Sequence, residues 1–175
     1  MTTLSQLVQT AEHFQRATNI YLDFNDVSKI NNYIPSQKAL SILEEILNGT
    51  INNQRAHVIY GPYGVGKSIL GVILINILTK NANSCKELKR LEERIKKDFP
   101  ASNYPKIIEY LNNNTRYLPV ILHGNTDDLQ KEMLCSLKLS LSKNGLEDIK
   151  IPSAYEKVKD VIKLWKEQYE NVYFD

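Results

Sequence analysis

The sequence lacks the features of secreted and membrane-spanning proteins. It has only two cysteines, Cys85 and Cys135, without metal-type spacing, and we expect both thiols to be small hydrophobic core residues in a reducing compartment. No basic segment followed by an apolar one opens the chain, so no signal peptide is indicated. The most apolar run, residues 69–78, is too short to span a bilayer. These absences predict a cytoplasmic protein with no membrane partner.

A strong excess of charge of either sign is also missing. The 22 basic and 20 acidic residues leave a net charge of +2, which does not indicate nucleic acid as a partner. Hydrophobic residues make up 42% and charged residues 24%, a balance typical of soluble globular proteins, and 175 residues suit one domain. No Ser/His/Asp, Cys/His or paired-carboxylate arrangement can be recognised.

One stretch does carry recognisable chemistry. Residues 61–68, Gly-Pro-Tyr-Gly-Val-Gly-Lys-Ser, fit the pattern G-x-x-x-x-G-K-[ST] of a phosphate-binding loop. The β-rich run 56–60 precedes this stretch and the apolar run 69–78 follows it. The pattern therefore predicts a strand, a loop and a helix in the order that phosphate binding requires. The alternative is a glycine-rich turn without a ligand, but Lys-Ser directly after the last glycine has no folding role.

The residue types of the loop indicate how it would bind a nucleotide. Its glycines let the backbone turn sharply and bring N–H groups close to phosphate, at the positive end of the following helix. We expect Lys67, the candidate catalytic residue, to reach the β- and γ-phosphates, and the Ser68 hydroxyl to bind Mg²⁺. The guanine-reading pattern Asn-Lys-x-Asp is absent, which favours ATP. The predicted nucleotide-binding residues of the loop are Gly61, Pro62, Tyr63, Gly64, Val65, Gly66, Lys67, Ser68 and Ile69.

The periodicity of apolar residues predicts an α/β fold with a parallel sheet flanked by helices, of the P-loop NTPase type. Ser36 caps a helix that Gly49 ends, and the helix over 69–78 is apolar on nearly every side, as expected for packing against a sheet. Two i,i+4 pairs, Glu92/Lys96 and Glu93/Lys97, are expected in a charged helix. Helices are predicted at 36–48, 69–78, 84–99 and 104–111, near Thr3, after Asn125 or Thr126 and after Ser153, strands at 56–60 and 118–124, and an extended segment at 19–24.

The hydrolytic half of an ATPase site is not found. The apolar part of the second predicted strand, 120–122, continues into His123 rather than into the acid that usually holds Mg²⁺. His123 either faces the nucleotide or is simply hydrogen-bonded at the strand end. Asp127 and Asp128 follow and are the candidates for that acid, although capping of the next helix also explains them. We therefore expect residues 1–175 to form a single nucleotide-binding domain, truncated before Walker B, that binds ATP without efficient turnover.

The order of these motifs resembles the front of AAA+ ATPases of the origin-recognition and STAND type. The resemblance rests on Tyr33-Ile34-Pro35, the helix over 36–48 and the loop 61–68. It implies that Tyr33, Ile34 and Pro35 border the adenine base, and that the fold is the N-terminal half of an AAA+-like domain. The Walker B, sensor and arginine-finger regions of that family have no counterpart here.

A narrower resemblance is to the N-terminal region of large bacterial anti-phage defence ATPases of BREX type. It rests on residues 13–16 with 19–20, on the loop 61–68, and on 118–125 followed by 148–149. This resemblance implies a role in antiviral defence, with other subunits or the rest of a larger ATPase as partners. Hydrolysis would then belong to the complete protein.

Two other functions suit the same loop. A small phosphoryl-transfer kinase would have this length, but Arg90, Arg94 and Arg116 are too scattered to form its arginine-rich lid. A non-catalytic module would use nucleotide only to stabilise an interaction domain. Turnover of ATP with and without candidate acceptors separates the three functions.

Overall fold

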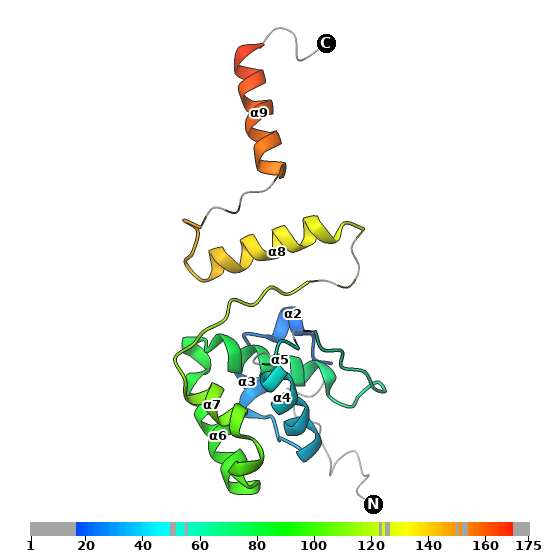
Figure 1. Ribbon diagram of the computed structural model, residues 1–175, viewed down its shortest axis with the longest axis vertical. Helices are drawn as coiled ribbons and strands as arrows, with labels where there is room; N and C mark the ends of the chain where they lie inside the picture. Colours follow the sequence, from blue (N-terminus) through cyan, green and yellow to red (C-terminus); the bar gives the residue numbers. More distant parts are fainter. Residues whose placement is uncertain are drawn as a thin grey trace, which may run out of the picture. The chain divides into compact units, whose positions relative to one another are not determined.

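The computed structural model describes residues 17–49, 52–54, 56–122, 124, 127–149, 151 and 154–169. The chain divides into two compact units, residues 1–119 and residues 120–175, here called the N-terminal unit and the C-terminal unit. The helices of the N-terminal unit are α2 (Ile20–Asp23), α3 (Val27–Asn31), α4 (Gln37–Gly49), α5 (Lys67–Thr79), η2 (Ala82–Ser84), α6 (Cys85–Asp98), η3 (Ala101–Asn103) and α7 (Pro105–Asn112) (Figure 1). The helix predicted near Thr3 lies outside the described residues.

The predicted parallel sheet is wrong, because the described residues contain helices and no β-strand. Among the described residues, the run 56–60 and residues 118–122 of the second predicted strand have no regular secondary structure, and neither forms a strand. Val58 is 86% exposed and Tyr60 is 90% exposed, although both were expected in a buried strand. An extended run becomes a strand only when a second run satisfies its N–H and C=O groups. β-Propensity sets the conformation of one run and cannot supply its partner.

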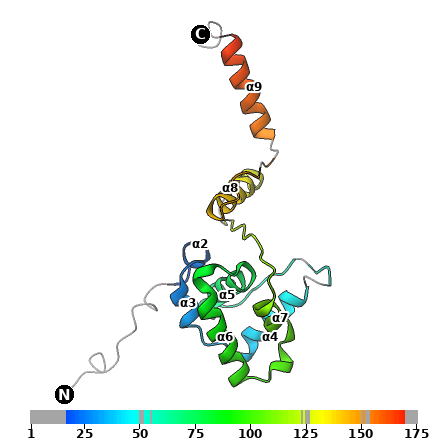
Figure 2. The ribbon, with the colours of Figure 1, turned by 90° about the vertical axis from the view of Figure 1, so that its left-hand side faces the viewer.

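Helices, and not a sheet, surround α5. No residue of α5 is exposed, so its expected burial is confirmed, but its neighbours are α2, α3, α4 and α7 (Figures 1 and 2). The core combines residues from α3 to α7 and the two segments that follow α3 and η3. Its fully or almost fully buried members are Ile30, Tyr33, Leu40, Leu43, Leu47, Leu70, Ile73, Ile77, Leu88, Leu91, Ile95, Tyr104, Ile107 and Tyr110.

Helices in the N-terminal unit are capped by side chains that are either local or distant in the sequence. Ser36 Oγ accepts a hydrogen bond from the Ala39 N–H at 3.2 Å, which confirms the predicted cap of α4. The carboxylate of Glu44, in the middle of α4, accepts bonds from the N–H groups of Lys106 at 2.8 Å and Ile107 at 2.9 Å. Glu44 therefore caps α7 from a distant part of the sequence, and it joins the two helices that pack together.

The segment predicted to be extended at residues 19–24 forms α2 instead. Asn19 Oδ1 accepts hydrogen bonds from the N–H groups of Tyr21 and Leu22 at 3.0 and 3.3 Å. In return, Asp23 Oδ2 accepts a bond from the Asn19 N–H at 2.7 Å. This reciprocal cap stabilises one turn of helix that the apolar composition does not suggest.

In the charged helix α6, Leu88, Leu91 and Ile95 are buried as helical periodicity predicts, and Lys96 pairs with Glu92 at 2.6 Å. The second predicted ion pair, Glu93 with Lys97, does not form among the described residues. Burial of the cysteines is also wrong, because Cys85 and Cys135 are both exposed. Cys85 begins α6, where its Sγ lies 3.5 Å from the Asn81 carbonyl oxygen rather than in the core.

The C-terminal unit contains α8 (Leu129–Lys143) and α9 (Ala154–Gln168). Asp128 caps α8 by accepting a bond from the Lys131 N–H at 2.9 Å, so the cap lies beyond the predicted Asn125 or Thr126. Met133 is 55% exposed and Trp165 is 52% exposed, although both belong to the faces that the periodicity predicts to be apolar. Across the described part of the chain, each helix is too short or too polar to cross a membrane.

Candidate nucleotide-binding site

The loop 61–66 has the backbone conformation that its glycines permit. Gly64 has φ 85°, and Gly66, the residue before α5, has φ 90° and ψ 18°. Both angles lie in the left-handed region, where a residue with a Cβ is strained. The glycines at these positions therefore determine the turn that leads into α5.

The first N–H groups of α5 are free to bind an anion. Gly66 makes no side-chain cap, and its carbonyl accepts the first helical bond, from the Leu70 N–H at 3.0 Å. Within the described residues, nothing accepts a hydrogen bond from the N–H groups of Lys67, Ser68 or Ile69. Unpaired donors at the positive end of a helix attract phosphate.

The Lys67 side chain lies across the beginning of the loop. Its Nζ donates to the carbonyl oxygens of Gly61 at 2.8 Å and Pro62 at 2.6 Å. This places an ammonium group beside the backbone that would surround a phosphate. The same group can exchange carbonyl oxygens for phosphate oxygens, because a charge-assisted bond to an anion is the stronger one.

The loop is open to solvent, and a ligand can reach it. All residues from Gly61 to Gly66 are exposed, with Tyr63 at 93% and Val65 at 61%. Ser68 is half-buried, and its hydroxyl has no hydrogen-bond partner among the described residues. The hydroxyl is therefore available to a metal ion that a nucleotide brings.

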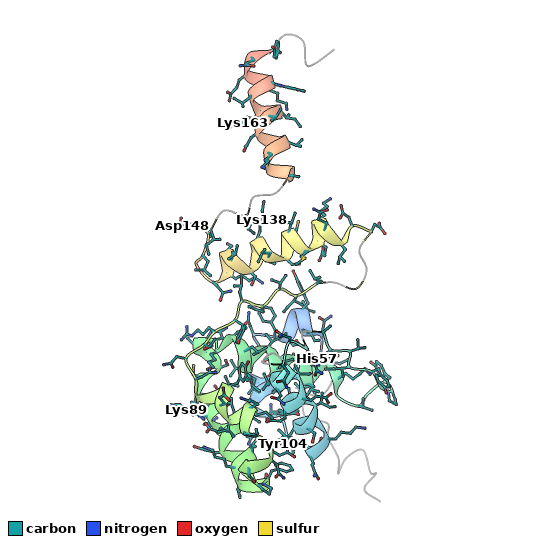
Figure 3. The ribbon with its side chains drawn as sticks, viewed as in Figure 1. His57, Lys89, Tyr104, Lys138, Asp148 and Lys163 are labelled. Atoms are coloured by element: carbon teal, nitrogen blue, oxygen red, sulfur yellow. The ribbon has the colours of Figure 1, made fainter. Side chains whose placement is uncertain are left out.

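The run that leads into the loop is fixed at its beginning by His57, which Figure 3 labels. The His57 Nε2 lies 2.9 Å from the Gln54 carbonyl oxygen. The imidazole also packs against the end of α4, where a Cβ on Gly49 would come within 2.7 Å of two ring atoms. The close approach of ring and backbone requires a glycine at the last position of α4.

The segment that was expected to border the adenine base is divided between core and surface. Tyr33 is a core residue, its hydroxyl is buried without a hydrogen-bond partner, and burial raises the pKa of Tyr33 to about 12. Pro35 is buried, whereas the Ile34 side chain is 84% exposed. Within the described residues, no hydrogen bond joins this segment to the loop 61–68. Of the three residues, Ile34 alone presents a large exposed side chain.

The candidate acids for Mg²⁺, Asp127 and Asp128, lie in the C-terminal unit. Asp128 caps α8, and Asp127 is exposed. His123 lies outside the described residues. The described residues contain no cluster of three or more His, Cys, Asp or Glu that could hold a metal ion. Magnesium at a phosphate loop does not depend on such a cluster, since phosphate oxygens and water supply most of its ligands.

Comparisons of the chain with protein-family models, with curated proteins and with solved structures found no match. The resemblance to AAA+ and BREX-type ATPases therefore stays a prediction from the sequence. The candidate site itself rests on the loop and on α5.

Proposed function

We propose that the chain binds ATP with Mg²⁺ through residues 61–68, as part of a larger or oligomeric ATPase. The observation that carries the proposal is the combination of groups around one exposed loop. These groups are the Lys67 ammonium, the unpaired N–H groups at the start of α5 and the two left-handed glycines. Each is a recognised contributor to phosphate binding, and together they surround one place.

Each group has a separate task in this proposal. The N–H groups of residues 67–69 and the loop amides bind the β-phosphate. Lys67 leaves the carbonyl oxygens of Gly61 and Pro62 and bridges the β- and γ-phosphates. The Ser68 hydroxyl joins the ligands of Mg²⁺, which neutralises phosphate charge. None of these contacts requires a sheet, because the glycines and the packing of α5 already position the loop.

Turnover by this chain is proposed to be slow. Phosphoryl transfer depends on a carboxylate that holds Mg²⁺ and on a group that positions the attacking water. The carboxylate of Asp128 is engaged at the start of α8. The loop supplies ground-state contacts to phosphate, so binding and hydrolysis should be separable. The antiviral role that the sequence resemblance suggests belongs to the complete ATPase.

The kinase alternative has less support. A kinase lid needs mobile arginines that close over the nucleotide, but two of the candidate arginines are held elsewhere. Arg90 Nη1 donates to Asn31 Oδ1 at 3.3 Å, and Arg94 Nη1 donates to the Tyr33 carbonyl oxygen at 3.0 Å.

The proposal is tested by Lys67→Ala, with Lys89→Ala as a control that removes the same charge from an exposed position on α6. Labelled ATP binding is measured with Mg²⁺, and far-UV circular dichroism checks the fold. We expect Lys67→Ala to weaken binding by roughly 10- to 150-fold, the worth of a hydrogen bond to a charged group of about 1.5–3 kcal/mol. Unchanged affinity in a folded Lys67→Ala protein, or an equal loss in Lys89→Ala, would contradict the proposal.

A further inference from the structure

A second candidate site lies in the N-terminal unit, away from the phosphate loop. A cavity of about 440 Å³ that is wide open to solvent is bordered by the end of α3, by the segment after it and by the last turns of α6. Ile34 and Pro35 contribute apolar wall, and no residue of the loop 61–68 lines the cavity. Its polar lining residues are Asn31, Asn32, Arg94, Lys97 and Asp98. The volume is within the range of sites for small organic ligands.

The cations of this cavity are arranged differently from the other cations of α6. Lys96 is paired with Glu92, and Arg90 is engaged by Asn31 and Glu87. Lys97, by contrast, has no hydrogen bond or ion pair within the described part of the chain, because its expected pair with Glu93 does not form. The cavity is therefore lined by an exposed lysine that forms no ion pair within the described part of the chain, although the carboxylate of Asp98 lines the same cavity.

Arg94 is held in place but keeps donors for a ligand. Its Nη1 donates to the Tyr33 carbonyl oxygen at 3.0 Å, and the described residues show no second hydrogen bond from its guanidinium. A guanidinium carries five N–H donors in a rigid fork that matches carboxylate and phosphate oxygens. Asn31 Oδ1 already accepts the bond from Arg90, so the amide nitrogen is the part of that side chain left to donate.

The preference of the last helical turn for cations does not account for this arrangement. A lysine near a helix C-terminus is favourable without any ligand, and that effect alone explains Lys96 or Lys97. It does not explain a cavity that Lys97 and Arg94 line together with two carboxamides and an apolar wall. In the sequence, α6 was interpreted as a charged solvated helix. Arg90, Arg94 and Lys97 recur at i, i+4 and i+7, which places them on one face.

We propose that this cavity binds a small organic anion, either a carboxylate or a phosphate ester, whose apolar part covers Ile34. Arg94 and Lys97 bind the anionic oxygens, and the carboxamides of Asn31 and Asn32 add neutral donors. Asp98 opposes the anion and favours a ligand that also carries a hydroxyl or amine donor. The exposed Ile34 side chain supplies the apolar contact. This site is independent of ATP binding at the loop 61–68.

The test is made in the Lys67→Ala background, so that the phosphate loop does not contribute. Sodium benzoate and phenyl phosphate serve as the carboxylate and phosphate-ester probes, and binding is followed by NMR of the Arg94 Nε–H and the Asn31 and Asn32 side-chain amides. Lys97→Met removes the unpaired charge and keeps the apolar stem. Lys89→Met is the matched control, since Lys89 lies on the same helix and does not line the cavity (Figure 3).

We expect saturable shifts of these resonances, an affinity about fivefold weaker in Lys97→Met, and a change below about twofold in Lys89→Met. Asp98→Asn should bind the same probes about two- to fivefold more tightly, a gain that misfolding cannot produce. Tighter binding of phenyl phosphate assigns the site to phosphate esters, and tighter binding of benzoate assigns it to carboxylates. The proposal is overturned if neither probe saturates at about 10 mM. Equal effects of Lys97→Met and Lys89→Met would overturn it as well.

Discussion

Two apolar runs flank the loop 61–68, and they differ in almost everything except their composition. Residues 56–60 form neither a helix nor a strand, and Val58 and Tyr60 are almost fully exposed. Residues 67–79 form α5, in which no side chain is exposed. A helix satisfies its backbone hydrogen bonds within itself and needs only a surface to pack against. A strand needs a second segment at the right register before its backbone is satisfied. One motif predicts both elements, and only the self-sufficient one forms.

The largest expected effect concerns the buried run. Ile73→Ala removes a fully buried side chain from α5, a helix that packs against four others, and leaves a cavity in the core. Such substitutions cost about 2–5 kcal/mol. Urea denaturation followed by circular dichroism should show this loss in the free energy of unfolding. A loss below about 1 kcal/mol would mean that α5 is not the centre of the core, and the comparison between the two runs would fail.

The second prediction concerns Gly49, against which the His57 ring of the run 56–60 packs. A Cβ on Gly49 would lie 2.8 Å from the Gln54 carbonyl oxygen and 2.7 Å from the His57 ring. Alanine is the better helix former by about 1 kcal/mol, but a clash with backbone cannot be relieved by rotating a side chain. Gly49→Ala should therefore lower the free energy of unfolding by about 1–3 kcal/mol.

The anchor can also be measured locally. In Gly49→Ala, amide hydrogen exchange should accelerate over residues 52–60 more than over α6. A stabilised Gly49→Ala protein would show that the ring of His57 does not hold the run against α4.

The third prediction concerns a buried polar group in the helical core, the hydroxyl of Tyr33. The Tyr33 hydroxyl is buried without a partner, which costs free energy in the folded state. Tyr33→Phe removes the hydroxyl and keeps the packing, so we expect the protein to become more stable by about 1 kcal/mol. Thermal denaturation at neutral pH measures the change. A destabilised Tyr33→Phe protein would indicate that the hydroxyl has a partner in solution.

The same substitution should change the response to alkaline pH. Burial raises the pKa of Tyr33 from 10.0 to about 12, so the folded state holds the phenolic proton more tightly than the unfolded state. The contribution of this group to stability is complete below pH 10, the unfolded value, and is lost as pH rises toward 12. Tyr33→Phe should lose less stability over that interval than the parent protein, as measured by denaturation at a series of pH values.

The smallest effect is expected in the exposed run. Val58→Ala should change the free energy of unfolding by less than about 0.5 kcal/mol, because the side chain is 86% exposed. Val72→Ala in α5 is the matched substitution, since Val72 is completely buried and should cost about 1.5–3 kcal/mol. Equal losses at the two positions would show that residues 56–60 are buried in solution, which is the most direct way to break the comparison.

Local patterns in the sequence were sufficient to predict most helices of the N-terminal unit. The ends of α4 follow from the Ser36 cap and from Gly49, and the stripe of α6 follows from helical periodicity. The loop was also predictable, because glycine conformations and the lysine and serine positions are encoded within eight consecutive residues. Capping, periodicity and loop chemistry all act between residues that are neighbours in the chain.

Only the tertiary structure decided the features that depend on distant residues. Whether residues 56–60 become a strand depends on a partner, and the capping of α7 by Glu44 joins positions 62 and 63 residues apart. The cavity that Lys97 lines depends likewise on how α3 packs against α6. The sequence of a segment determines which of its backbone hydrogen bonds form within that segment, as in a helix or a glycine turn. The backbone groups of a strand must instead bond to another segment, and the tertiary structure determines whether that segment is present. The helices and the loop were therefore predictable, and the sheet was not.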